Sequence, residues 1–327
     1  MSDVKPRPDL HFKSVTITGR APGRRLIILG AVHGNETCGT RAIQRVLEDL
    51  DHHQLSIVSG SLTLIPIANP LAYARGAREG ERNLNRNLTP KEHPEDFEDH
   101  VANWLCPLLA QHEVLLDLHS FRARSEPFAM IGPLDNSGDI QPFSQATQER
   151  ALARRLGVNR CVDGWLNTYA LGVERRIGEA VAAGRAPDAK TEDTRYGVGT
   201  TEYMRSVGGY ALTLECGQHD DPSAPEVAYQ AILRTLSHLR MTPAAAPEPA
   251  ERIEALSIHE VTDKRHPEDT FSRTWASFDR LAKGDLIGTR HDGTPVIAAD
   301  DAVILFPDAK AQPGREWFYL ARTNATF

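Results

Sequence analysis

Short apolar runs that end in glycine or in polar residues recur along the first part of the chain, and segments with helical periodicity separate them. Residues 24–31 ("RRLIILGA") and 61–70 ("SLTLIPIANP") each predict a buried strand, ended by glycine or by Asn-Pro. Residues 113–120 and 210–217 repeat this pattern. Strands that alternate with helices favour an α/β domain with a largely parallel or mixed sheet. In such a sheet, ligands bind at the carboxyl ends of the strands.

The organisation of the chain changes after residue 240. Apolar residues at helical spacing predict helices in 36–50, 96–112 and 224–240. The segment 241–252 ("MTPAAAPEPAER") is rich in Pro and Ala and has no periodicity, which is typical of a linker. Short β-prone runs broken by Gly-Asp, Asp-Gly and Asp-Asp turns follow. The sequence therefore predicts an α/β domain over 1–240, a linker over 241–252 and a small all-β domain over 253–327.

The composition narrows the class of partner. The 327 residues are 40% hydrophobic and 25% charged, and their net charge is −7. This charge argues against a nucleic-acid or anionic-membrane partner, since binding to either needs a positively charged surface. No apolar run approaches ~20 residues, and no apolar signal segment opens the sequence. Four widely spaced cysteines fit reduced thiols, so we expect a cytoplasmic protein. Association of identical subunits is left open.

Two histidines and a glutamate follow predicted strands. His33 and Glu36 come directly after the first strand, and His119 ends the third in the same way. Imidazole and carboxylate are suitable zinc ligands, and a catalytic site needs three of them with one position open. A lone H-x-x-E is more often a surface or core feature, but the flanking glycines and the matching His119 favour a metal site. We expect one Zn²⁺ per chain, bound by His33, Glu36 and His119, with Asp117 supporting a ligand from behind.

Two further features fit a hydrolase. Glu215 ends another apolar strand, where a carboxylate is costly unless it is paired or functional. It is our candidate for the general base that such an enzyme needs. Residues 75–88 ("RGAREGERNLNRNL") hold four arginines and three asparagines. They predict either a solvated basic loop or an anion pocket, because guanidinium groups bind carboxylates and stabilise oxyanions.

The motifs "HGNE", "NLNR", "DLH" and "TLECG", in this order, resemble the succinylglutamate desuccinylase/aspartoacylase family. The resemblance extends to "KGDLIG" and "DGTPVIAADDAVILFP" near the C-terminus. It implies a zinc-dependent amidohydrolase with residues 1–240 as the catalytic domain. The implied fold is a zinc-carboxypeptidase-like mixed sheet flanked by helices, with a small all-β C-terminal domain.

The resemblance also implies roles for individual residues. His33, Glu36 and His119 match the zinc ligands, and Glu215 matches the catalytic glutamate. The implied substrate-contacting residues are Arg78, which polarises the scissile carbonyl, and Asn85, Arg86, Arg205 and Tyr319, which bind the substrate. One position departs from the family pattern Asp-x-Asn-Arg, because Asn83 stands where the family usually has Asp.

We therefore expect an enzyme that removes an acyl group from a small N-acyl amino acid carrying a free carboxylate. N-succinylglutamate and N-acetyl amino acids both remain candidates. One alternative is a zinc carboxypeptidase acting on peptides, which would share the metal site. Another is a non-catalytic protein in which zinc only stabilises the fold; this is disfavoured because structural zinc sites usually fill all four positions and favour cysteine.

Overall fold

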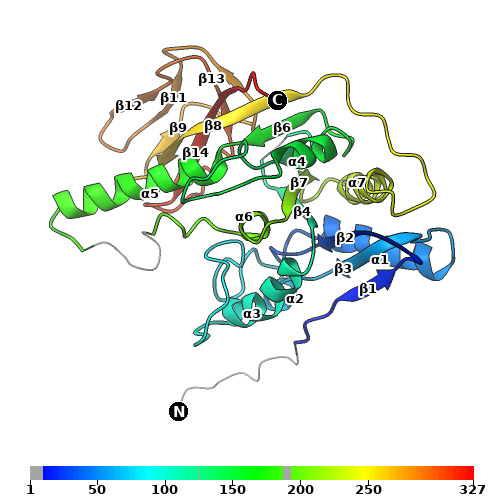
Figure 1. The fold of residues 1–327 in the computed structure, drawn as a ribbon. Coiled ribbons are helices and arrows are strands. Elements are labelled where there is room, and N and C mark those ends of the chain that lie inside the picture. Colours follow the sequence, from blue (N-terminus) through cyan, green and yellow to red (C-terminus); the bar gives the residue numbers. More distant parts are fainter. Residues whose placement is uncertain (1–9, 124, 187–192) are drawn as a thin grey trace.

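The computed structural model describes residues 10–123, 125–186 and 193–327, and a large mixed sheet runs through it (Figure 1). In this part of the chain eleven strands lie in the order β1-β3-β2-β4-β7-β5-β6-β8-β14-β13-β10. Their bounds are β1 Val15–Thr18, β2 Ala21–Leu29, β3 Ser59–Ile65, β4 Val114–Phe121, β5 Phe128–Met130, β6 Arg160–Asp163, β7 Tyr210–Gln218, β8 Glu254–Asp263, β10 Arg280–Leu281, β13 Ala302–Leu305 and β14 Glu316–Thr323. The strands β3, β2, β4 and β7 are parallel to one another, so their carboxyl ends share one edge.

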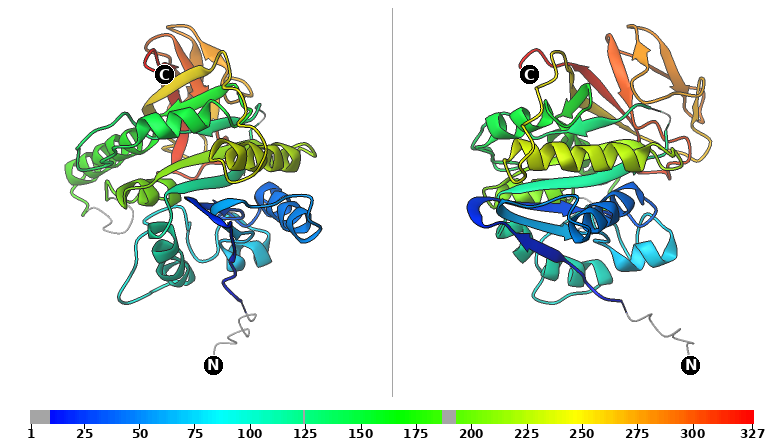
Figure 2. Two further views of the ribbon diagram at one scale, coloured as in Figure 1. Left: turned by 45° about the vertical axis from the view of Figure 1, so that its right-hand side comes forward. Right: turned by 90° about the vertical axis from the view of Figure 1, so that its right-hand side faces the viewer.

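Helices cover both faces of this parallel region (Figure 2). Helices α1, α4 and α7 pack on one face, and α2, α3 and α6 lie on the other, while α5 packs against β8. The bounds are α1 Cys38–Asp51, α2 Pro70–Arg75, α3 Phe97–Ala110, α4 Ala146–Ala153, α5 Trp165–Ala182, α6 Thr200–Ser206 and α7 Ala224–His238. No helix in the described ranges is both long and apolar enough to cross a membrane.

The two faces explain why the strands read as unbroken apolar runs. Successive side chains of a strand point to opposite faces. In β2, Leu26 and Ile28 therefore pack under α1 and α7, whereas Ile27 and Leu29 pack under α3, and all four are fully buried. A strand buried on both faces is apolar along most of its length. The predicted mixed α/β sheet flanked by helices is thus confirmed.

The C-terminal region is rich in strands, as predicted. Strand β8 pairs with β6 and continues the main sheet, and β14, β13 and β10 follow it. A separate three-stranded sheet holds β12 (Pro295–Ile297), β11 (Leu286–Thr289) and β9 (Thr270–Phe271). Trp317 of β14 is fully buried in the cluster that joins the two sheets. The predicted division into two domains joined by a linker at residues 241–252 stays a prediction. The main sheet contains strands from both sides of this segment.

A buried carboxylate on α3 shapes the arginine-rich segment 75–88. Glu98 is fully buried and accepts hydrogen bonds from the backbone N–H groups of Gly80, Glu81 and Arg82, each at 3.1 Å to its nearer oxygen. It also accepts one from Asn69 Nδ2 at 2.8 Å. A charged acceptor with several donors is a strong anchor in a low-dielectric interior. Glu98 therefore fixes the path of the loop that carries the candidate substrate-binding arginines.

We expect Glu98→Ala to lower the free energy of unfolding by about 2–4 kcal/mol, because buried N–H groups lose their acceptor. Urea unfolding followed by circular dichroism measures this. The exposed Glu92→Ala, in the segment between this loop and α3, is the control and should unfold like the wild type. Equal unfolding midpoints for the two variants would contradict the anchoring role.

Candidate metal and substrate site

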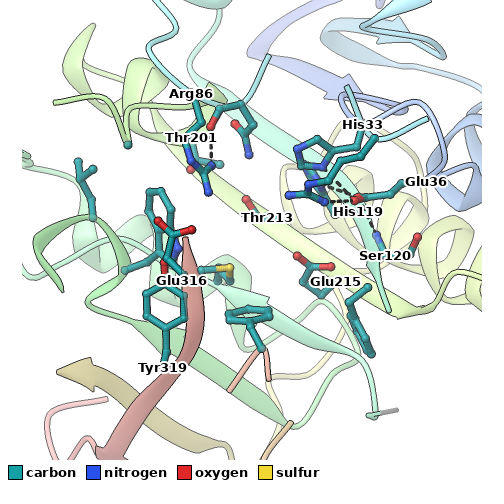
Figure 3. Close-up of a pocket in the computed structure, with 18 of the residues that line it drawn as sticks. His33, Glu36, Arg86, His119, Ser120, Thr201, Thr213, Glu215, Glu316 and Tyr319 are labelled. Atoms are coloured by element: carbon teal, nitrogen blue, oxygen red, sulfur yellow. Dashed lines mark hydrogen bonds and ion pairs between the residues drawn. The ribbon is translucent and has the colours of Figure 1, made fainter. Parts of the chain in front are cut away.

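His33 and Glu36 lie in the tight segment between β2 and α1. Gly34 makes this path possible, since a Cβ atom at this position would lie 2.0 Å from the backbone carbonyl carbon of Ala72. Only glycine permits so close a backbone approach. The segment therefore passes against α2 and directs both side chains to the carboxyl ends of the parallel strands, where they are buried (Figure 3).

The Glu36 carboxylate is the centre of the cluster. Its Oε1 lies 2.9 Å from His33 Nδ1 and accepts a hydrogen bond from Arg78 Nη1 at 2.8 Å. Its Oε2 lies 2.8 Å from His119 Nδ1 and accepts a hydrogen bond from the backbone N–H of Ser120 at 3.1 Å. Ligand atoms of His33, Glu36 and His119 all lie within 4.8 Å of one another. The strand-end residues named in the sequence thus converge on one point.

The outer nitrogens of both imidazoles face polar groups. His33 Nε2 lies 3.1 Å from Asn83 Oδ1, and His119 Nε2 lies 2.9 Å from Asp117 Oδ2. An acceptor at one ring nitrogen leaves the other free as a metal ligand. His33 Nδ1 and His119 Nε2 are both buried without a hydrogen bond, although each lies 2.9 Å from a carboxylate oxygen. Two imidazoles, a carboxylate and unsatisfied nitrogens fit the ligand set of a zinc ion.

The protonation states follow from the burial of the cluster. Burial and the nearby Arg78 guanidinium lower the pKa of His33 to about 4, so its imidazole is neutral at pH 7. Burial opposes ionisation of Glu36, but His33 and His119 hold its pKa well below the ordinary value. Burial lowers the pKa of His119, but Asp117 and Glu36 outweigh burial and hold it well above the ordinary value. A metal ligand must be a neutral imidazole, so His119 has to release its proton when a divalent cation binds.

Glu215 lies beside this cluster on β7. The strand register places it opposite His119 of β4. The side chain is largely buried, and its Oε2 has no hydrogen-bond partner. Burial raises the pKa of Glu215 to about 7. A carboxyl group near neutrality, with a free oxygen, can both accept and return a proton.

These groups line one cavity of about 320 Å³, a volume suited to a small amino-acid derivative. The candidate metal ligands and Glu215 lie at one end, and Arg86, Glu316 and Tyr319 lie at the other (Figure 3). The Arg86 guanidinium lies 4.7 Å from the ring centroid of Trp165, and its Nη1 donates to the carbonyl of Asn85 at 2.7 Å. Among the described residues, its Nε and Nη2 have no partner, so they can bind an anion.

The other predicted substrate contacts differ in their surroundings. Asn85 Oδ1 accepts the backbone N–H of Thr200 at 2.9 Å, which leaves the amide nitrogen as a donor. Tyr319 is buried and lines the cavity. Arg205 also lines the cavity, but its guanidinium forms a two-point ion pair with Glu149, at 2.9 and 3.2 Å. The role of Arg205 in binding a substrate carboxylate stays a prediction. The Glu149 carboxylate already occupies the guanidinium and would compete with a substrate carboxylate for it.

Several cavity residues were not predicted from the sequence. Ser120 Oγ lies 2.8 Å from His219 Nδ1, and both line the cavity near the candidate metal ligands. The place of Ser120 directly after His119 was a signal that could have identified it. Trp165 and Glu316 had no such signal, because long-range packing brings them to the cavity.

The comparisons with known proteins agree with the resemblance seen in the sequence. Residues 22–137 match the family model of the succinylglutamate desuccinylase/aspartoacylase catalytic domain. The resemblance to this family is therefore confirmed. No curated protein matches the chain.

Solved structures share the fold over nearly the whole chain. A succinylglutamate desuccinylase/aspartoacylase from Rhodobacter sphaeroides is 16% identical with a TM-score of 0.71, covering 96% of this chain and 90% of its own. The product-bound ectoine utilization protein EutE (DoeB) from Ruegeria pomeroyi is 16% identical with a TM-score of 0.68, covering 94% and 88%. The succinylglutamate desuccinylase from Chromobacterium violaceum is 21% identical with a TM-score of 0.63, covering 95% and 88%. At these identities the likeness shows the fold alone.

We expect the protein to bind one zinc ion per chain and His119→Ala to lose it, because two remaining ligands hold zinc weakly. Metal analysis after dialysis against zinc, and calorimetric titration of metal-depleted protein, measure this. The exposed His259→Ala is the matched control and should bind zinc like the wild type. Unchanged zinc content in His119→Ala would remove this cluster as the metal site.

Proposed function

We propose that this protein is a zinc-dependent amidohydrolase that removes the acyl group from a small N-acyl amino acid with a free carboxylate. One observation carries the proposal. A buried His-Glu-His cluster, a Glu215 oxygen without a hydrogen-bond partner and an Arg86 guanidinium line the same small cavity. The confirmed resemblance to the succinylglutamate desuccinylase/aspartoacylase family supports the same reaction class.

In this proposal His33, Glu36 and His119 would hold the metal, which would supply Lewis acidity for the carbonyl and for a water molecule. Glu215 accepts a proton from the attacking water and later donates it to the departing nitrogen. Its raised pKa suits both steps, since a group near neutrality exchanges protons in either direction at pH 7. Burial of the cluster strengthens these electrostatic effects.

Arg78 lies at the metal end of the cavity. Its contact with Glu36 places the guanidinium beside the point where the scissile carbonyl would lie. A fixed cation there stabilises the negative charge that grows on the carbonyl oxygen as water adds. Arg78 is therefore proposed to act on the transition state.

Arg86 and Asn85 are proposed to bind the carboxylate of the amino acid. The free nitrogens of Arg86 and the free amide nitrogen of Asn85 are donors, and a carboxylate accepts such hydrogen bonds at two oxygens. Trp165 supports the guanidinium through a cation–π contact. Arg205 and Tyr319 remain proposed contacts of the same substrate.

The cavity favours a small substrate over a peptide. Phe306, Pro307 and Asp308, which follow β13, and two residues of β14 line it. The C-terminal strands therefore close one side of the cavity. A zinc carboxypeptidase that acts on peptides would need this side open to admit the peptide chain. A purely structural metal is also disfavoured, because Glu215 beside the cluster has an unpaired oxygen.

We expect Glu215→Gln to keep bound zinc and to lower kcat by about 10²–10⁴-fold, because the amide cannot accept the proton. Hydrolysis of N-acetyl and N-succinyl amino acids, measured together with metal content, tests this. Near-normal turnover with zinc bound would remove Glu215 from the mechanism.

We expect Arg86→Ala and Arg78→Ala to differ in kinetics. Arg86 binds a carboxylate in the ground and transition states alike, so its loss should raise KM at least as much as it lowers kcat. Arg78 acts on a charge that develops only during the reaction, so its loss should lower kcat by about 10²–10³-fold.

The amide of a good substrate provides the control for Arg86. This compound lacks the free carboxylate, and the wild type should hydrolyse it poorly. The assignment is wrong if the amide is hydrolysed as well as the acid, or if the two variants show one kinetic signature.

A further inference from the structure

One carboxylate in the cavity has no role in the proposed reaction and forms only a long ion pair within the fold. Besides Glu36 and Glu215, the described acidic residues that line the cavity are Glu202, Asp308 and Glu316. Glu202 caps α6, with its oxygens accepting from Gly199 N at 3.0 Å and Thr201 Oγ1 at 3.1 Å. Asp308 Oδ1 accepts the backbone N–H of Lys310 at 2.8 Å in a turn. The Glu316 carboxylate accepts no hydrogen bond from the described part of the chain.

The nearest cation to Glu316 is already paired. Arg176 Nη1 lies 4.0 Å from Glu316 Oε1, but the same nitrogen donates to Asp263 Oδ1 at 3.0 Å. No ion pair within 4 Å joins Glu316 to Arg86. The Glu316 side chain is only 23% exposed. A largely buried carboxylate without a close partner is costly unless a ligand supplies the charge.

A β-bulge directs Glu316 into the cavity. In a regular strand, residues three apart point to opposite faces. In β14 the register shifts between Glu316 and Phe318, so that both Glu316 and Tyr319 line the cavity, while Trp317 and Phe318 pack behind the strand. Bulges often re-aim a side chain beside a functional site. Figure 3 shows Glu316 at the same end of the cavity as Arg86, away from the candidate metal ligands.

We propose that Glu316 binds a cationic group of the substrate, so that the substrate is an N-acyl derivative of a diamino acid. The inference rests on the proposed function and defines its substrate class. Arg86 binds the carboxylate, and Glu316 binds the amino group that carries no acyl group. That ammonium is the side-chain amine of an Nα-acylated substrate or the α-amine of a substrate acylated on its side chain. A second carboxylate in the amino-acid part, as in N-acylglutamate, would be repelled.

The test compares four acetylated substrates of similar size with zinc-loaded wild type and Glu316→Gln. Nα-acetyllysine and Nε-acetyllysine carry the ammonium at different places, N-acetylnorleucine has none, and N-acetylglutamate carries a second carboxylate. We expect kcat/KM for one acetyllysine to exceed that for N-acetylnorleucine by about 10- to 100-fold, mainly through KM. In Glu316→Gln this ratio should fall close to one. Asp308→Asn removes a charge from the same cavity and should keep the wild-type preference.

Two results overturn the inference. One is a wild type that hydrolyses N-acetylnorleucine or N-acetylglutamate as well as both acetyllysines. The other is a Glu316→Gln variant that keeps the preference. If none of the four compounds is hydrolysed, the proposed function fails first. Calorimetry with free lysine and norleucine then still tests Glu316, since only lysine should bind to the wild type and Glu316→Gln should bind neither.

Discussion

The arrangement of the site depends on a single buried carboxylate. Glu36 is 1% exposed, and it contacts two imidazoles, one guanidinium and one backbone N–H group. These partners come from the segment after β2, from β4 and from the arginine-rich loop. A charge this deeply buried is stable only when its partners surround it, and loss of one partner leaves it uncompensated. The Glu36 cluster therefore ties three separate segments to one point, and a divalent cation at that point would add to the same compensation.

Chemistry and recognition are carried by different parts of the fold. The register between β4 and β7 fixes His119 opposite Glu215, so the reacting end of the cavity is part of a rigid sheet. Arg86 lies on a loop that Glu98 anchors, and Glu316 lies on a C-terminal strand. Loops tolerate change more readily than a sheet buried on both faces. The loop that carries Arg86 is therefore a part of this cavity that can change readily, and the metal end is more constrained.

The strand-end pattern was sufficient to predict the α/β sheet and the meeting of His33, Glu36 and His119, because parallel strands share one carboxyl edge. Local periodicity cannot reveal a bulge, so it gave no reason to single out Glu316. It also could not show that Arg205 pairs with Glu149, a residue 56 positions earlier. Asn83 departs from the family pattern, yet its amide oxygen supplies the acceptor that faces His33 Nε2.

The central claim is that a single metal ion at the Glu36 cluster converts this cavity into an amide-hydrolysing site. The most direct test titrates metal-depleted wild type with Zn²⁺ while the release of free amino acid from a panel of N-acyl amino acids is followed. The account predicts no hydrolysis without metal and activity that reaches its maximum at one equivalent of zinc per chain. Full hydrolysis by the metal-depleted protein, or no hydrolysis of any compound in the panel at full zinc occupancy, would contradict it.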